Sequence, residues 1–121
     1  MLELIFSENE NYCYIPKYKI KTPALCLGLF PQFIKNFDTL WKNKIITVDK
    51  KKLKLKWNYS LISLAQYFYY QKYKCTFFWS VVELDFDIKK GKLKQSFYMN
   101  KRQDKGKDSR GYAKIKDLLK L

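Results

Sequence analysis

Apolar and polar positions alternate with a period of two over much of residues 1–22, which is typical of β-strands. Leu2, Leu4 and Phe6 form a short apolar start, and a polar stretch follows at residues 7–11. Aromatic residues then alternate with lysines. This pattern predicts a β-hairpin with its turn at residues 7–11, and Pro16 predicts a sheet edge or a break in the second strand.

Three later segments show the apolar spacing of amphipathic helices. The first covers residues 32–43. The second begins at a cap provided by Asn58 or Ser60 and runs to about residue 73. The third is the C-terminal helix, which Ser109 caps and which contains apolar residues up to Leu119. We expect each of these helices to bury one face.

Residues 77–86 are rich in strand-forming residues, but their apolar spacing also suits a helix. We predict a helix because a turn and a second helical face follow. The two form a helix-turn-helix-like unit with helices at 79–86 and 91–99. Polar residues should lie on the exposed side of its second helix: Lys92, Lys94, Gln95 and Asn100. The polar residues 100–111 predict a loop.

These elements predict an α+β fold, in which a small N-terminal β element packs on a helical, helix-turn-helix-like C-terminal portion. The length fits a single domain over 1–121, with a mixed β/α part at 1–50 and a helical, basic part at 51–121. The apolar faces predict this core: Phe33, Phe37, Trp41, Leu61, Leu64, Phe68, Trp79, Val82, Phe86, Leu93, Phe97, Ile115 and Leu118.

Some segments have two interpretations each. Lysines dominate residues 50–56, where they either guard a solvated strand edge or face phosphates. Tyrosines surround Phe68, and they either pack in the core or stack on bases. Residues 45–48 fit a short strand or a loop, while Thr22 before Pro23 fits the start of a helix.

The chain has no histidine, which removes the usual general base at neutral pH and the nucleophile arrangements that need one. It also has no P-loop, dinucleotide-binding or nucleophile-elbow motif. We therefore expect a protein that is not an enzyme and that uses no cofactor.

Cys13, Cys26 and Cys75 form neither an even set nor a C-x-x-C pair. We predict buried thiols in a reducing cytoplasm rather than disulfides or a zinc site. The short apolar start lacks the basic region of a signal peptide, and no apolar run is long enough to span a bilayer. We expect a cytoplasmic protein with no membrane partner.

The charge is strongly basic, with 25 Lys and Arg against 11 Asp and Glu and a net charge of +14. Lysine, which suits phosphates better than base edges, outnumbers arginine 23 to 2. Residues 89–116 alone carry a net charge of +9, which favours a phosphate-binding surface, although an AT-rich genome would also raise the lysine content. Nine residues are the predicted nucleic-acid contacts: Lys89, Lys90, Lys92, Lys94, Lys101, Arg102, Lys105, Lys107 and Arg110.

A magnesium site is an alternative function for three acidic residues, Glu83, Asp85 and Asp87. In an extended segment the three carboxylates would share one face and could bind Mg²⁺ as in a nuclease, whereas in a helix they diverge. Because a helix is predicted here, we expect no metal site.

Several segments of the C-terminal half resemble the RteC family, which comprises regulatory proteins of Bacteroidetes conjugative transposons. The similar segments span about 65 residues and are Leu55-Lys56-Trp57, the helix from Ser60 to Tyr73, the aromatic helix ending at Phe86, Phe97-Tyr98, Lys101-Arg102 and the helix from Tyr112 to Leu119. The resemblance implies an all-helical, winged-helix-like DNA-binding region and an origin in a mobile element. Residues 1–50 lie outside it.

Charge and resemblance together predict a non-catalytic nucleic-acid-binding protein of a mobile element or phage, which binds DNA or RNA through its C-terminal lysine-rich surface. One alternative is an anti-CRISPR-type inhibitor that binds a guide-RNA-loaded host nuclease or its guide RNA. The second is a small ribosome-associated protein. The oligomeric state is not predicted.

Overall fold

A computed structural model describes residues 3–7, 12–22, 30–49, 51–52, 54–71 and 78–121. The expected helix start at Pro23, most of the turn at 7–11, Cys26 and Cys75 lie outside the described residues. The described part begins with β1 (Ile5–Ser7), β2 (Tyr12–Ile15), the 3₁₀-helix η1 (Pro16–Tyr18), β3 (Ile20–Thr22), α2 (Pro31–Lys42), β4 (Ile46–Asp49) and β5 (Lys54–Trp57). It continues with α3 (Leu61–Gln71), α4 (Phe78–Asp85), α5 (Lys92–Gln103) and α6 (Arg110–Leu119).

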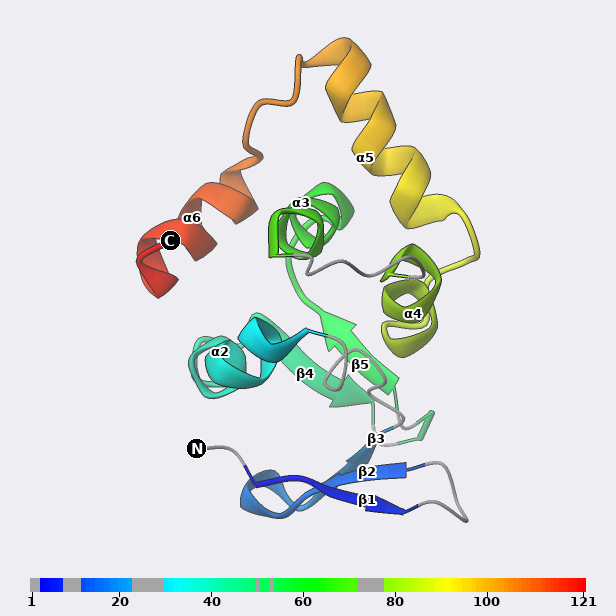
Figure 1. Ribbon diagram of the computed structural model, residues 1–121, viewed down its shortest axis with the longest axis vertical. Helices are drawn as coiled ribbons and strands as arrows, with labels where there is room; N and C mark the ends of the chain where they lie inside the picture. Colours follow the sequence, from blue (N-terminus) through cyan, green and yellow to red (C-terminus); the bar gives the residue numbers. More distant parts are fainter. Residues whose placement is uncertain (1–2, 8–11, 23–29, 50, 53, 72–77) are drawn as a thin grey trace.

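The predicted N-terminal hairpin is confirmed. β1 and β2 pair antiparallel, and Phe6 lies opposite Cys13. The break expected at Pro16 is η1, after which Lys19 takes the left-handed conformation with φ 52° and the chain returns as β3. The result is a three-stranded sheet in the order β1-β2-β3, which lies at the opposite end of the molecule from the α5–α6 connection (Figure 1).

β4 and β5 form a second antiparallel sheet, so residues 46–49 are a strand. The lysine-rich segment leads into β5, and two of its lysines have partners on the α4 side of the fold. Lys52 Nζ lies 3.1 Å from Asp87 Oδ2, and Lys54 Nζ donates to the Leu84 carbonyl at 2.9 Å. These contacts favour the strand-edge interpretation for both lysines.

Helix α3 is the centre of the helical portion, because its residues 63–68 are all buried. A single buried face was predicted, but α5 and α6 pack on α3 from two sides (Figure 1). The Phe68 ring also contacts Phe30 and Phe33, each at 5.1 Å between ring centroids. The tyrosines around Phe68 differ in burial. Tyr67 is fully buried, as the core-packing interpretation predicts, whereas Tyr70 is 45% exposed.

The α+β fold with a helical C-terminal portion is confirmed, and both predicted parts contribute to one hydrophobic core. Most predicted core residues are buried or packed against that core. The core prediction is wrong for Leu61 and Leu118, since each is 37% exposed. Leu61 precedes the buried run of α3, and Leu118 lies in the last turn of α6, whose buried contacts are Tyr112 and Ile115.

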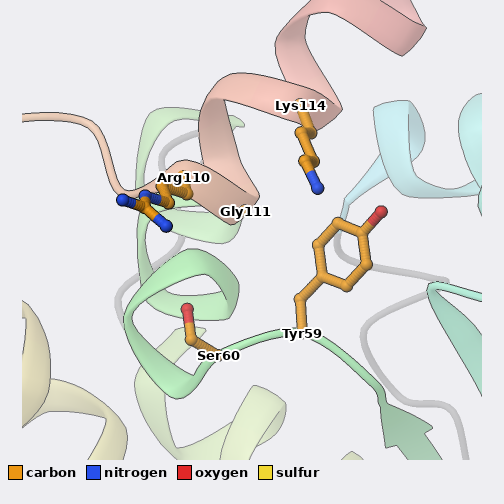
Figure 2. A pocket seen from close by; sticks show the side chains of 5 residues that line it. All are labelled: Tyr59, Ser60, Arg110, Gly111 and Lys114. Carbon is orange, nitrogen blue, oxygen red and sulfur yellow. The ribbon is translucent and has the colours of Figure 1, made fainter.

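The first turn of α6 packs closely on the start of α3 at Gly111 (Figure 2). A Cβ added to Gly111 would lie 2.8 Å from Ser63 Cβ and 3.2 Å from Tyr59 Cδ2. Ser63 is buried, so a side chain at position 111 would force α3 and α6 to shift apart.

Replacing Gly111 with alanine should therefore lower the free energy of unfolding by about 1–3 kcal/mol through overpacking, despite the better helix propensity of alanine. Urea denaturation measures the change. The exposed Lys114→Ala in the same helix is the matched control and should change stability by less than about 0.5 kcal/mol. A Gly111→Ala protein as stable as the wild type would contradict the close packing.

Cys13 is a free, fully buried thiol, as predicted for this cysteine. Burial, with a smaller effect of the nearby Asp85 charge, raises the pKa of Cys13 to about 11. The unfolded chain loses this proton at a lower pH than the folded chain. The resulting stabilisation is therefore complete below the unfolded pKa and is lost as the pH rises towards 11.

Between pH 8 and pH 11 the wild type should accordingly lose about 2 kcal/mol more stability than Cys13→Ala, which removes this group and leaves the other titrating residues in place. Urea titrations of both proteins across this range measure the difference. Parallel stability curves for the two proteins would contradict it.

Candidate nucleic-acid interface

Helices α4 and α5 pack on each other and form the predicted two-helix unit. Val82, Phe86, Leu93 and Phe97 are buried between the helices and the core, as expected. The second helix is longer than predicted, because α5 continues through Gln103. The loop predicted for residues 100–111 is correspondingly shorter and covers residues 104–109.

The buried Glu83 carboxylate holds the start of α5. Gly91 is the N-cap residue with φ 87° and has no side chain to cap the helix. Glu83 Oε2 instead accepts a hydrogen bond from the Leu93 amide at 2.9 Å. A negative charge at a helix N-terminus is favourable, so Glu83 fixes the direction in which α5 leaves the turn.

The alternative magnesium site does not form. Residues 83–85 are helical, and the three carboxylates have different surroundings. Glu83 caps α5, Asp85 is fully buried, and Asp87 pairs with Lys52. Among the described residues, no three histidine, cysteine, aspartate or glutamate side chains are grouped so that they could hold a metal ion.

All nine predicted contact residues are exposed, and we call this set the C-terminal basic surface. They follow one path from the α4–α5 turn along α5, over the connecting loop and into α6 (Figure 1). They do not all share one face. At about 100° per residue, Lys94 and Lys101 lie on the same side of α5, whereas Lys92 lies on nearly the opposite side.

Several members of the C-terminal basic surface lie close together at the C-terminal end of α5. The loop folds back there, since the Gly106 amide donates to the Asn100 carbonyl at 3.2 Å and Gly106 lies against the Lys101 side chain. Lys101 and Arg102 lie in the last turn of α5, and Lys105 lies two residues after the end of the helix at Gln103. Arg110 is separate, because it begins α6 and lies beside Lys114 (Figure 2).

Aromatic rings surround Lys101 near the end of α5. Lys101 Nζ is 5.6 Å from the ring centroids of both Tyr69 and Phe97, and 6.0 Å from that of Tyr98. Tyr98 is 40% exposed and lies between Lys94 and Lys101 along the same side of the helix. Tyr98 and Lys114 are not among the predicted contacts, although each lies four residues after a predicted one, Lys94 and Arg110 respectively.

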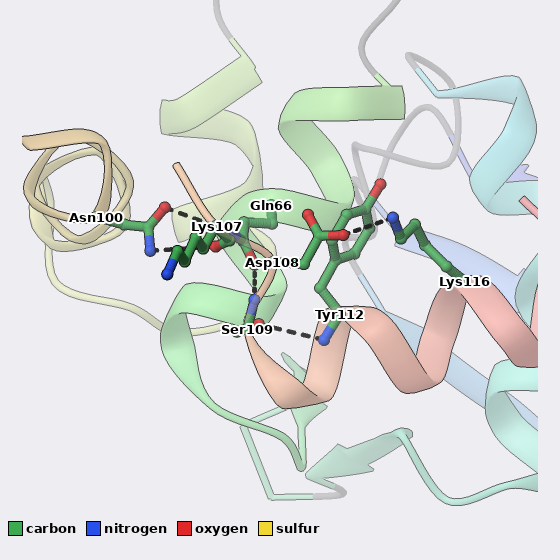
Figure 3. A network of polar contacts seen from close by, with 7 residues as sticks. All are labelled: Gln66, Asn100, Lys107, Asp108, Ser109, Tyr112 and Lys116. Carbon is green, nitrogen blue, oxygen red and sulfur yellow. Dashed lines mark hydrogen bonds and ion pairs between the residues drawn. The ribbon is translucent and has the colours of Figure 1, made fainter. Parts of the chain in front are cut away.

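Gln66 ties the basic loop to the central helix (Figure 3). Its side chain is fully buried on α3, where its amide nitrogen donates to the Lys107 carbonyl at 2.7 Å and its oxygen accepts from the Ser109 amide at 2.9 Å. The same nitrogen lies 3.3 Å from Asn100 Oδ1. Asn100 was predicted on the exposed side of the helix, but this network turns it towards the loop.

Ser109 completes the connection as the N-cap of α6, as predicted, because its hydroxyl accepts from the Tyr112 amide at 3.2 Å. Asp108 next to it forms an ion pair with Lys116 (Figure 3). The hydrogen bond from Lys116 to Asp108 is the main cause of a raised pKa of Lys116. Asp108 is thus paired with a lysine outside the basic surface.

The other ion pairs among the described residues also involve lysines outside the basic surface. They join Lys17 to Asp38 and Lys52 to Asp87. In the part of the chain that the structure covers, no member of the C-terminal basic surface pairs with a carboxylate. The charge of this surface is therefore not neutralised by the rest of the described fold.

No protein-family model, curated protein or solved structure matches this chain. The resemblance to the RteC family accordingly stays a prediction. Over the described ranges, none of the helices combines the length and the apolar character needed to cross a membrane.

Replacing Gln66 with alanine should release the loop, because the Lys107 carbonyl and the Ser109 amide both lose a buried partner. We expect a loss of about 2–3 kcal/mol in stability and faster hydrogen exchange at the Ser109 amide. Urea denaturation and amide exchange by NMR measure the two effects. The exposed Gln95→Ala serves as the control, and slow Ser109 exchange in Gln66→Ala would show that Gln66 does not hold the loop.

Proposed function

We propose that this protein is a non-catalytic nucleic-acid-binding protein, and that the C-terminal basic surface contacts the phosphate backbone. One observation carries the proposal: all nine cations are exposed, and none is paired with a described carboxylate, whereas three lysines elsewhere are paired. Concentrated unpaired charge destabilises a fold by self-repulsion unless a polyanion neutralises it.

Helix α5 is the central element of this proposal. Its twelve residues include four cations and no acidic residue, and they extend over about 18 Å at 1.5 Å per residue. A helix of this size fits the major groove of DNA. The Gln66 network and the Glu83 cap hold both ends of α5, so little ordering of the backbone is needed on binding.

The composition of the surface favours phosphate contacts over base reading. Seven of its nine members are lysines, which act as mobile point charges, and Arg102 is the one arginine on α5. We therefore expect binding that depends strongly on salt and weakly on sequence. Exposed Tyr98 adds a ring that can stack on an unpaired base.

The test compares two triple variants that remove the same charge. Lys94→Gln, Lys101→Gln and Arg102→Gln together alter α5, while Lys35→Gln, Lys42→Gln and Lys44→Gln alter exposed positions on and just after α2. Fluorescence anisotropy with duplex DNA, single-stranded DNA and single-stranded RNA over a range of salt concentrations gives the affinity and its salt slope.

The α5 triple variant should bind at least about tenfold more weakly at low salt, and its salt slope should fall by about 2 to 3, because each lost phosphate contact contributes about 0.7 to 0.9. The α2 triple variant should stay close to the wild type. Equal losses in both variants would mean that net charge alone drives binding. A wild type that binds none of the three probes at low salt would overturn the proposed function.

A further inference from the structure

A cavity of about 250 Å³ lies between the segment that enters α3 and the first turns of α6. Tyr59, Ser60, Arg110, Gly111 and Lys114 line it (Figure 2). Ser60 and Arg110 flank one end, Tyr59 and Lys114 flank the other, and Gly111 lies between them. Residues about 50 positions apart in the sequence therefore meet here.

The walls of this cavity are fixed by contacts within the fold. Gly111 approaches Ser63 and Tyr59 so closely that no side chain fits between them. Ser63 Oγ in turn accepts from Trp57 Nε1 at 3.0 Å and donates to the Ser60 carbonyl at 2.6 Å. Ser60 Oγ accepts from the Ser63 amide at 3.3 Å, which leaves its hydroxyl proton available to a ligand.

The charge of the lining is entirely positive. Arg110 and Lys114 are four residues apart on α6, and their charged groups lie at opposite ends of the cavity (Figure 2). Both are exposed, and neither pairs with a described carboxylate. The acidic residue nearest to Arg110 in the sequence, Asp108, is paired with Lys116.

We propose that this cavity binds a phosphate group, with Arg110 and Lys114 as its charged ligands and the Ser60 hydroxyl as a further donor. Arginine supplies a planar pair of donors and lysine a point charge, and both long, exposed side chains can turn towards a phosphate that lies between them. The cavity has a volume of about 250 Å³, just below the ~300–1,000 Å³ typical of pockets for drug-sized ligands, so it has room for a phosphate and part of the attached sugar.

This inference rests on the proposed function for the source of the phosphate, which is the nucleic acid itself. Two sources share the chemistry, an internal phosphodiester and a terminal phosphate. In both, the Tyr59 ring forms an apolar wall beside the bound group, where a sugar can pack. The cavity thus extends the contact from α5 across the loop to α6.

The experiment uses the full chain and two charge-matched variants. Lys114→Gln removes a cavity cation, and Lys35→Gln removes an exposed lysine of α2 that lies outside both the cavity and the C-terminal basic surface. Inorganic phosphate is titrated into ¹⁵N-labelled protein while the Gly111 amide is followed by NMR. Affinity is then measured for one single-stranded oligonucleotide with either a 5′-phosphate or a 5′-hydroxyl.

We expect a saturable shift of the Gly111 amide in the wild type and in Lys35→Gln, and its loss in Lys114→Gln. Oligonucleotide binding should weaken about tenfold in Lys114→Gln, as for a lost hydrogen bond between charged groups. Weakening with the 5′-phosphorylated strand alone assigns the cavity to a terminal phosphate, and equal weakening with both strands assigns it to an internal one.

The absence of a saturable phosphate shift, or a shift that persists unchanged in Lys114→Gln, would overturn the phosphate site, whatever the oligonucleotides do. A saturable shift in a protein that binds neither oligonucleotide would instead overturn the proposed nucleic-acid function and leave the phosphate site standing. The two proposals therefore fail separately.

Discussion

The burial of the middle of α3 is the constraint on which the rest of the structure depends. Its residues 63–68 include Ser63 and Gln66, and a buried polar side chain is costly unless it is hydrogen-bonded. Ser63 bonds to Trp57 and to the start of its own helix, and Gln66 bonds to the loop before α6. The apolar residues of α3 thus build the core, and its polar residues fix the segments around it.

This arrangement joins stability to the candidate interface. The Gln66 network sets the course of the loop between α5 and α6, while the Glu83 cap sets the start of α5. Because both contacts are buried and fully internal, they order a segment that is otherwise exposed and strongly positive. The cations are consequently presented on a fixed backbone, which lowers the entropy lost on binding a polyanion.

Much of the fold could be predicted because the local patterns agreed with the tertiary structure. The N-terminal hairpin, the helices and the Ser109 cap follow from spacing and capping rules that act over a few residues. The end of α5 could not be predicted in this way. The polar residues 100–103 favour a loop by composition, yet Asn100 gains partners in Gln66 and Lys107 that are distant in sequence or beyond the helix.

The sequence by itself determined the α+β architecture, the large excess of positive charge and its concentration near the C-terminus. Only the tertiary structure decided which lysines are paired, which tyrosines are buried and that Tyr59 and Ser60 meet Arg110 and Lys114. The reason is that charge and periodicity are local properties of the chain. Pairing, burial and cavities depend on contacts between segments whose separation along the chain carries no information about their distance in space.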